Sequence, residues 1–281
     1  MKILIIGSNS LLGKNLYNFY KKKKCDVIVN SRFSLKKITN WKKDIIKNIK
    51  KHKPDLIFYC SAAQTQKDDA RNLKKIIFTN CEVPCLIAQT LDEYNLSKSK
   101  LIFFGTSWEE NSEGKYYPVN LYAASKKAAE NLLNHYALKG TNIINFKLFD
   151  TYEENDKRKK FLNILIKSLI KNEELQITKG MQEINLTHML DICKGVHVGI
   201  LESKNWKFKK KGILKFHLGQ KKVITIKKLV NFAEKSFNKK SKAIFGALKY
   251  RDREPMKTFK KFSTPKNWSP KININSYLNK K

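Results

Sequence analysis

Lys2-Ile3-Leu4-Ile5-Ile6-Gly7-Ser8-Asn9-Ser10-Leu11-Leu12-Gly13 is the stretch of this chain that decides the fold. Residues 2–6 form an apolar run that ends at Gly7, which is typical of a strand buried in a parallel sheet. The following residues open a helix, and phosphate binding there needs a tight turn, exposed backbone N–H groups and a positive helix end. Gly7 can give the turn, and Gly13 can let the helix pack closely on the strand. The stretch predicts a phosphate loop, with a plain strand–turn–helix connection as the alternative.

The glycine spacing of this loop is Gly-x5-Gly, with Ser10 where a middle glycine would complete Gly-x2-Gly-x2-Gly. Serine carries a Cβ atom, so the backbone approaches a pyrophosphate less freely there. The position of the loop between a buried strand and a helix still favours binding of a dinucleotide. We expect the cofactor to contact Gly7, Ser10, Leu11, Leu12 and Gly13.

Strand and helix patterns alternate along the first half of the chain. Strands are expected at Lys2–Ile6, Asp26–Val29, Asp55–Tyr59, Leu101–Phe104 and Asn142–Leu148, and helices at Leu11–Tyr20, Asp44–Lys51, Leu121–Leu138 and, broken near Pro84, within Leu73–Asp92. Repeated strand–helix units predict an α/β fold with a Rossmann-type doubly wound parallel sheet.

The pattern loosens after about Asp150. Helices are expected at Phe161–Ile170 and Ile226–Phe237, and short strands near Leu175–Ile177 and Leu214–Leu218. We therefore predict an NAD(P)-binding domain at residues 1–150 and a smaller C-terminal lobe at residues 151–281 that mainly binds substrate.

The end of the second strand bears on the choice of cofactor. An NAD enzyme usually places an acidic residue there to bond the adenine-ribose 2′-hydroxyl. This chain has Ser31 and Arg32 instead, which suit a 2′-phosphate. We predict that both residues bind the cofactor and that NADP(H) is preferred. NAD(H) is the alternative, with Arg32 as an ordinary loop cation.

Tyr122 and Lys126 are the main candidates for catalysis. Residues four apart on a helix share one face, and an ammonium beside a phenol favours the phenolate and lowers the tyrosine pKa. The pair could then pass a proton near neutral pH. Thr106, in the loop after a strand, could hold a carbonyl oxygen against the phenol. By itself a Tyr-x3-Lys pair is a weak signal, and an exposed pair is the alternative.

The formal net charge of +34 comes from lysines spread along the whole chain. The sequence has no arginine-rich stripe and no helix-turn-helix or zinc-finger spacing. We therefore expect neither nucleic acid nor a membrane as partner, and a basic, non-enzymatic Rossmann-like protein that binds RNA is the remote alternative. The chain lacks an apolar run of membrane-spanning length and an address signal, so a cytoplasmic location is expected.

The chain has five cysteines. An odd number without a signal peptide favours free thiols in a reducing compartment. Cys81 and Cys85 are four residues apart, but no second Cys or His pair lies nearby in the sequence. We therefore expect no bound metal.

With the glycine loop, Thr106, Tyr122 and Lys126 in this order, the chain resembles the extended short-chain dehydrogenases/reductases, or NAD-dependent epimerase/dehydratase family. Two segments, Gly105-Thr106-Ser107-Trp108 and Pro118-Val119-Asn120-Leu121-Tyr122-Ala123-Ala124-Ser125-Lys126, are most similar to the nucleotide-sugar 4-keto reductases. That branch includes the CDP-abequose and CDP-paratose synthases and the dTDP-6-deoxyhexose 4-reductases. The resemblance is compatible with a homodimer.

The resemblance also implies further binding residues. On the cofactor side it adds Cys60, Ser61, Ala62, Ala63 and Asn80 to the glycine loop, together with Tyr122 and Lys126. On the side of a nucleotide-diphosphate sugar it implies Thr106, Ser107, Trp108, Lys160, Gln182, Arg251 and Arg253. A surface ion-pair network with Asp252 and Glu254 is the alternative for the two arginines.

The function expected from the resemblance is reduction of the C4 keto group of a nucleotide-linked 4-keto-6-deoxyhexose, in deoxysugar and surface polysaccharide (lipopolysaccharide) synthesis. A nucleotide-sugar 4-epimerase with tightly bound NAD uses the same three side chains and is the alternative. A dehydratase is less favoured, because Ser107 and Trp108 stand where dehydratases of this kind carry an Asp-Glu pair.

Overall fold

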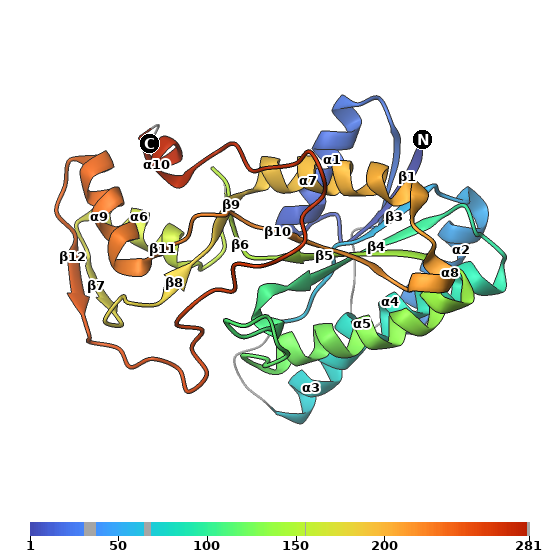
Figure 1. Cartoon of the computed structure of the whole chain (residues 1–281), viewed down its shortest axis with the longest axis horizontal. Coiled ribbons are helices and arrows are strands. Elements are labelled where there is room, and N and C mark those ends of the chain that lie inside the picture. The colour runs from blue at the N-terminus through green and yellow to red at the C-terminus, as the bar shows by residue number, and fades with distance from the viewer. Residues whose placement is uncertain (31–37, 65–68, 155, 280–281) are drawn as a thin grey trace.

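A six-stranded parallel sheet forms the centre of the molecule (Figure 1). The computed structural model describes residues 1–30, 38–64, 69–154 and 156–279, with no side-chain description for 38–40; Ser31 and Arg32 therefore lie outside the described residues. In sheet order the strands are β10 (Leu214–Leu218), β5 (Asn142–Leu148), β4 (Lys100–Thr106), β3 (Leu56–Tyr59), β1 (Lys2–Ile6) and β2 (Asp26–Asn30). The order reverses at β1, so the carboxyl ends of β1 and β3 flank the switch point where such sheets bind ligands.

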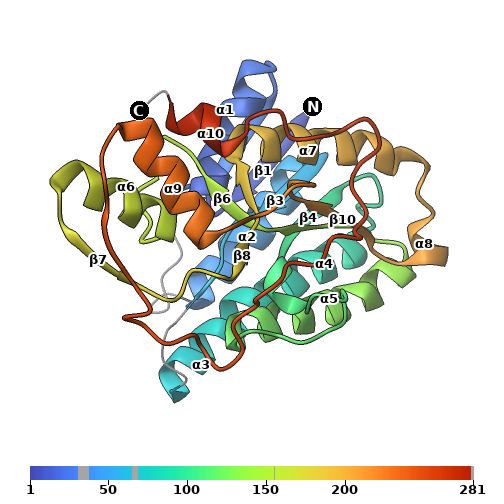
Figure 2. The same cartoon turned by 60° about the vertical axis from the view of Figure 1, so that its left-hand side comes forward.

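Helices cover both faces of this sheet (Figures 1 and 2). One face carries α1 (Leu11–Lys22) and α7 (Met189–Glu202), and the other carries α2 (Ile38–His52), α4 (Val83–Glu93) and α5 (Leu121–Lys139). Shorter pieces are α3 (Ala70–Ile77), the π-helical turn η2 (Phe78–Glu82), the 3-10 turns η3 (Ser107–Glu109) and η4 (Ser203–Asn205), and α8 (Phe208–Lys211).

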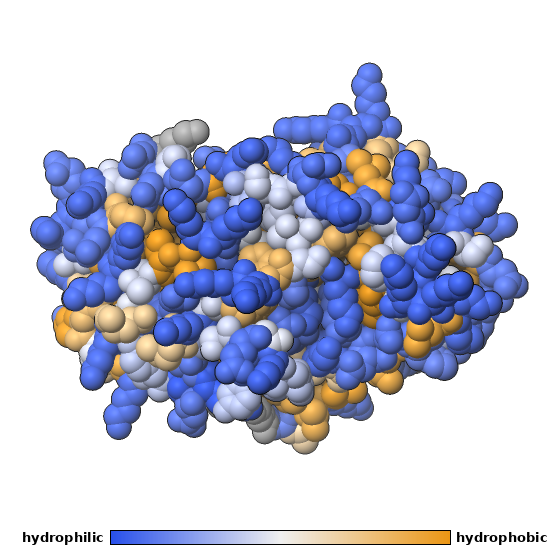
Figure 3. Space-filling view, in the orientation of Figure 1, coloured by the Kyte–Doolittle hydropathy of each residue, from blue (hydrophilic) through white to orange (hydrophobic). Residues whose placement is uncertain are grey.

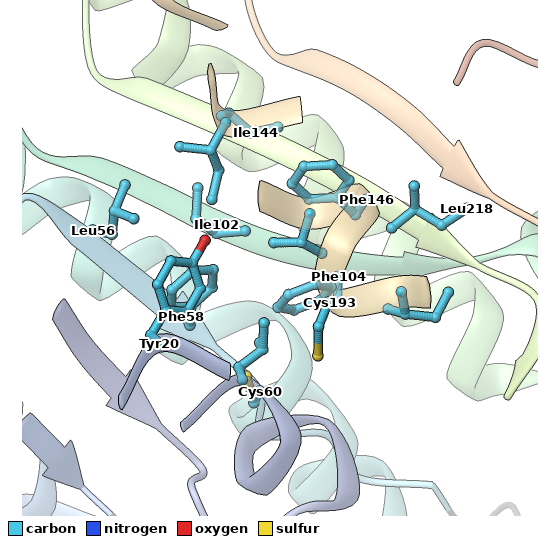
Figure 4. Close-up of a cluster of buried hydrophobic side chains, with 14 of the residues drawn as sticks. Tyr20, Leu56, Phe58, Cys60, Ile102, Phe104, Ile144, Phe146, Cys193 and Leu218 are labelled. Atoms are coloured by element: carbon cyan, nitrogen blue, oxygen red, sulfur yellow. The ribbon is translucent and has the colours of Figure 1, made fainter. Parts of the chain in front are cut away.

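Two apolar layers sandwich the sheet. Side chains from alternate positions of a strand point to opposite faces, so Ile3 and Ile5 join the layer under α1 and α7, while Leu4 and Ile6 join the layer under α2, α4 and α5. Figure 4 shows the first layer, where aromatic and aliphatic side chains of the central strands meet Tyr20 of α1 and Cys193 of α7. Burial on both faces explains the apolar run that opens the sequence.

A smaller group of elements packs around a third apolar cluster beside the carboxyl ends of the strands (Figure 2). Its members are β6 (Asp150–Tyr152), α6 (Phe161–Lys171), β7 (Glu174–Ile177), β8 (Glu183–Ile184), β9 (Leu186–His188), β11 (Ile224–Thr225), α9 (Ile226–Phe237), β12 (Lys242–Phe245) and α10 (Ile274–Leu278). Two separate segments of the chain thus form this lobe, and the chain returns to the main sheet between them. Residues 189–218 supply α7, α8 and β10 to the large domain, although they follow the predicted boundary at residue 150.

The structure corrects three details of the sequence predictions. The strand at Leu214–Leu218 pairs with β5 in the main sheet, not with the small lobe. The helical stretch before Asp92 is interrupted at the π-helical turn η2 and not at Pro84. Pro84 lies in the first turn of α4, where its missing N–H costs little. Thr106 is the last residue of β4 and does not lie in the loop that follows.

Hydrophilic side chains spread over the whole visible face of the molecule, with small apolar patches between them (Figure 3). Several lysines lie over aromatic rings, for example Lys50 Nζ at 4.3 Å from the ring centre of Tyr94. Across the described part of the chain, no helix combines the length and apolar character needed to cross a bilayer.

Candidate active site

The cleft with the predicted catalytic residues opens at the carboxyl ends of β1, β3, β4 and β5. Its volume is about 250 Å³. From the predicted set it is lined by Ser10, Leu11, Leu12, Cys60, Ser61, Ala62, Thr106, Ser107, Trp108, Tyr122, Lys126 and Lys160. Residues far apart in the sequence therefore meet at the switch point of the sheet.

Gly7 and Gly13 shape the loop between β1 and α1. Gly7 has φ +86°, and a Cβ atom there would lie 2.4 Å from Ser61 Oγ. A Cβ atom on Gly13 would lie 2.4 Å from the Gly7 carbonyl oxygen. Only glycine fits either position without displacing backbone, so this turn is closed tightly against the loop after β3.

Ser10 has a structural reason to replace a glycine. It is the N-cap of α1, and its Oγ accepts a hydrogen bond of 3.0 Å from Gly13 N. Within the described residues the N–H groups of Leu11 and Leu12 have no such partner, as is usual in a first helical turn. Donors at a helix N-terminus beside a tight glycine turn fit the pyrophosphate of a dinucleotide.

Asn80 lies behind this cofactor side of the cleft. Asn80 is fully buried. Its amide oxygen accepts a hydrogen bond from Ala63 N, and its amide nitrogen donates to the Ala63 carbonyl and to Ser125 Oγ, each at 2.9 Å. These contacts tie the loop after β3 to α5. Asn80 and Ala63 do not line the cleft, so they shape the predicted cofactor site without facing it.

Tyr122 and Lys126 project into the cleft from the start of α5. Asn120 caps this helix by accepting a hydrogen bond from Ala123 N, which fixes where the first turn begins. Lys126 is 2% exposed. Its Nζ lies 6.0 Å from the ring centre of Tyr122 and 4.7 Å from that of Phe103.

The protonation of this pair differs from the sequence prediction. Burial raises the pKa of Tyr122, the Glu109 carboxylate raises it further, and Arg158 opposes them. Burial also lowers the pKa of Lys126 to about 8, against the opposing effect of Glu109. The expected lowering of the Tyr122 pKa by Lys126 was therefore wrong for this structure, because burial and the Glu109 carboxylate raise it and the cation that opposes them is Arg158. A tyrosine held as the neutral phenol is suited to donating a proton.

Thr106 is held at the floor of the cleft by a neighbouring carboxylate. Glu109 Oε1 accepts a hydrogen bond of 2.9 Å from Thr106 N, and Thr106 Oγ1 accepts one of 3.3 Å from Trp108 N. Thr106 and Glu109 thereby form a capping box at the start of the short turn η3. Glu109 is fully buried, the Glu110 side chain is partly buried, and neither lines the cleft.

A buried ion-pair network lies behind this turn. Lys147 of β5 is 3% exposed and lies among three carboxylates, at 3.0 Å from Glu109, in contact with Glu110, and at 3.8 Å from Glu130. Burial lowers the pKa of Lys147, but Glu109 and Glu130 outweigh this and raise it. Lys147 is therefore a permanent positive charge inside the domain.

Glu130 on α5 joins this network to the surface. Its carboxylate accepts hydrogen bonds from Lys127 at 2.6 Å, Lys215 at 2.9 Å and Asn145 at 2.6 Å. Burial raises the pKa of Glu130, but Lys147, Lys127 and Lys215 outweigh it and lower the pKa to about 2.

We expect Glu130→Gln to lower the free energy of unfolding by about 3 kcal/mol at pH 7, because buried ammonium groups lose their carboxylate. Because the pKa of Glu130 is lowered in the folded protein, its carboxylate stabilises the fold fully above the unfolded-state pKa of about 4.5. This stabilisation is lost as the pH falls toward about 2. Urea unfolding at pH 7 and pH 3 should therefore show a smaller difference from the wild type in acid. The exposed Glu113→Gln is the control, and equal stability of wild type and Glu130→Gln at pH 7 would contradict the prediction.

Two cations lie over Trp108: Lys160, which lines the cleft, and Arg251, which lies outside its lining. Lys160 Nζ lies 5.3 Å and the Arg251 guanidinium carbon 5.6 Å from a ring centre of Trp108. Lys160 also pairs with Asp150 at 3.3 Å, and Arg251 with Glu254 at 3.7 Å. Two cations held against one indole give this side of the cleft a positive character.

The remaining predicted substrate residues lie outside the cleft lining. Arg253 donates a hydrogen bond of 3.0 Å to the Pro118 carbonyl, which places it near the segment that leads to α5. Gln182 exchanges hydrogen bonds with Thr178 and does not reach the cleft.

Arg158, Asp150 and Thr151 line the cleft but were not among the predicted site residues. The Arg158 guanidinium donates to Asp156 at 2.7 Å and to the Thr151 carbonyl at 2.8 Å, which fixes it beside the cleft. The three consecutive basic residues 158–160 are a sequence pattern that could have indicated a positively charged wall here. The sequence could not say which of its cations turns inward.

The five cysteines are free thiols. Cys81 Sγ contacts the Ser125 carbonyl at 3.1 Å and packs under α5. Among the side chains that the structure describes, no group of three or more His, Cys, Asp or Glu is placed to hold a metal ion.

Comparison with known proteins agrees with this geometry. The model of the NAD dependent epimerase/dehydratase family matches residues 3–208. A CDP-abequose synthase from Yersinia pseudotuberculosis is 24% identical over 220 residues, which cover 74% of this chain and 76% of that protein.

Two solved structures show the same fold. A UDP-glucuronic acid 4-epimerase from Bacillus cereus, in complex with UDP-glucuronic acid and NAD, has a TM-score of 0.81 at 21% identity and covers 99% of this chain and 96% of its own. A dTDP-4-dehydrorhamnose reductase from Clostridium acetobutylicum has a TM-score of 0.73 at 20% identity and covers 93% of this chain and 90% of its own. Since the family model spans most of the chain, this protein belongs to the NAD-dependent epimerase/dehydratase family, the extended short-chain dehydrogenases/reductases.

Proposed function

We propose that the protein is an NADPH-dependent reductase of the C4 keto group of a nucleotide-linked 4-keto-6-deoxyhexose, in the synthesis of deoxysugars for surface polysaccharides. The observation that carries this proposal is the meeting of Tyr122, Lys126 and Thr106 in one cleft with the phosphate loop of β1 and α1. The similarity to a CDP-abequose synthase supports the sugar class.

The cofactor would lie along the loop from Gly7 to Gly13 and the small residues Cys60, Ser61 and Ala62. When bound, it supplies the hydride for the carbonyl carbon. The preference for NADPH still rests on Ser31 and Arg32, which lie outside the described residues.

Three side chains share the remaining chemistry. Tyr122 donates its proton to the oxygen that gains charge at C4, which fits a phenol kept neutral by burial. Lys126, as an ammonium below about pH 8, supports the phenol and bonds the cofactor ribose. The Thr106 hydroxyl donates to the same substrate oxygen and stabilises its developing charge.

The nucleotide-sugar would occupy the wall formed by Trp108, Lys160 and Arg158, with Arg251 beyond Trp108. Positive charge on this side suits a diphosphate. Substrate binding would thus draw mainly on the later part of the chain, and cofactor binding on residues 1–150.

The positions of Glu109 and Glu110 favour a reductase over a dehydratase. Both carboxylates turn into the Lys147 network, so among the described residues these two do not supply the cleft with the acid–base pair needed to remove water across the sugar ring. The 4-epimerase remains the alternative, since it uses the same three side chains.

A substrate panel tests the proposal. Purified protein is incubated with NADPH or NADH and the CDP-, dTDP-, UDP- or GDP-linked 4-keto-6-deoxyhexose. We expect loss of absorbance at one equivalent per product, with a new C4 hydroxyl seen by NMR and NADPH preferred. Conversion of a nucleotide sugar without net consumption of cofactor would contradict a reductase and favour an epimerase.

A further inference from the structure

The carboxylate of Glu109 lies behind the cleft where the proposed reaction has no use for it. Its side chain is fully buried and accepts a hydrogen bond from Thr106 N at the end of β4. Contact with β4 is close, because a Cβ atom on Gly105 would lie 2.9 Å from Glu109 Oε1. The absence of a side chain at Gly105 is what lets a carboxylate reach this position.

Lys147 compensates the charge of Glu109 on the side away from the cleft, at 3.0 Å. The other two glutamates of the network have further partners: Glu110 lies 3.1 Å from His217 Nε2, and Glu130 pairs with Lys127 and Lys215. Within the described part of the chain, Glu109 pairs with Lys147 and with no second cation. Burial raises the pKa of Glu109 above its ordinary value, and Lys147 and the Thr106 N–H reduce this rise without cancelling it.

On its other side the turn that carries Glu109 packs against α5, the helix of Tyr122 and Lys126. The charged or titratable groups that act on this pair are Glu109 and Arg158 for Tyr122, and Glu109, Cys81 and Cys60 for Lys126. Both thiols are buried, and burial raises the pKa of each, so they stay neutral. Glu109 is then the anion that acts on both members of the pair.

We propose that Glu109 is a positioning residue with two effects: it fixes Thr106 at the floor of the cleft, and its buried carboxylate favours the ammonium form of Lys126 and adds to the burial that keeps Tyr122 a phenol. Lys147 favours the ionised form of Glu109 and thus acts one step further back. The link to rate rests on the proposed reductase function, whereas the effect on Lys126 does not.

The direction of the effect follows from Coulomb's law. Removing a nearby negative charge disfavours an ammonium and favours a phenolate, so the pKa of both groups falls. In the wild type, activity should decline above about pH 8 as Lys126 loses its proton. In Glu109→Gln, which keeps an amide oxygen as acceptor for Thr106 N, this decline should move to lower pH by roughly 1 pH unit.

Two readouts test the proposal: the pH profile of kcat for NADPH oxidation, and the Lys126 transition in NMR spectra of ¹³C-lysine-labelled protein, assigned with Lys126→Arg. Glu109→Asp should restore most of the wild-type profile, since it keeps the charge. Glu113→Gln, which removes an exposed charge four residues later, is the matched control and should leave both readouts unchanged.

If Glu109→Gln does not fold, Glu109→Gln/Lys147→Met replaces it, because it removes both charges and leaves Glu110 and Glu130 with their other partners. A lower rate with unmoved pH profile and unmoved Lys126 transition would overturn the proposal and reduce Glu109 to a structural residue. If the wild type turns over none of the sugars, the proposed function fails, and the Lys126 transition alone decides the role of Glu109.

Discussion

Replacing Tyr122 with phenylalanine should lower kcat for reduction of the 4-keto sugar by about 10²- to 10⁴-fold, because the substrate oxygen loses its proton donor. The ring stays, so the walls of the cleft and the affinity for NADPH should change little. Steady-state kinetics with the active sugar of the panel, together with NADPH titration, measure both quantities.

Tyr116→Phe is the control for this variant. It removes a hydroxyl from a tyrosine that is 54% exposed in the segment before α5. Near-full reductase activity of Tyr122→Phe would show that another group supplies the proton, and the assigned chemistry would be wrong.

Lys126→Met should lower kcat/KM by at least about 10²-fold, with a larger effect on cofactor affinity than Tyr122→Phe has. Methionine fills similar space beside Phe103, so the loss reports the ammonium and not a cavity. The residual activity should also lose the decline above about pH 8, because the group with that pKa is gone.

The pH dependence separates this role from a loss of stability. Lys115→Met, at a lysine whose side chain is 77% exposed, is the matched control and should keep the wild-type profile. A Lys126→Met variant with normal cofactor affinity and an unchanged high-pH limb would contradict the assignment.

Local patterns in the sequence were enough to predict which residues meet at the core of the candidate site. The apolar run and glycine turn at residues 2–13 predicted β1, the start of α1 and the loop between them. The four-residue spacing of Tyr122 and Lys126 placed both on one helix face, and in the structure both line the cleft, while their catalytic roles stay a prediction. These features depend on residues close together in the chain, so the sequence contains them directly.

Features that depend on distant contacts were missed. The strand at Leu214–Leu218 has the same pattern whether it joins β5 or the small lobe, and only the packing of α7 and α8 on the main domain decides this. The tyrosine pKa was predicted in the wrong direction because burial and Glu109 are set by tertiary packing. Likewise, Glu109 and Glu110 point away from the cleft toward Lys147, which lies on β5 and is distant in the sequence.

Transfer of a labelled hydride tests the central claim most directly. The protein is given NADPH that carries deuterium at C4 of the nicotinamide, on the face that is transferred, together with the accepted 4-keto sugar. The account predicts deuterium at C4 of the sugar product, one NADP⁺ formed for each sugar reduced, and loss of this transfer in Tyr122→Phe. A product without deuterium, or formed without NADP⁺, would contradict it.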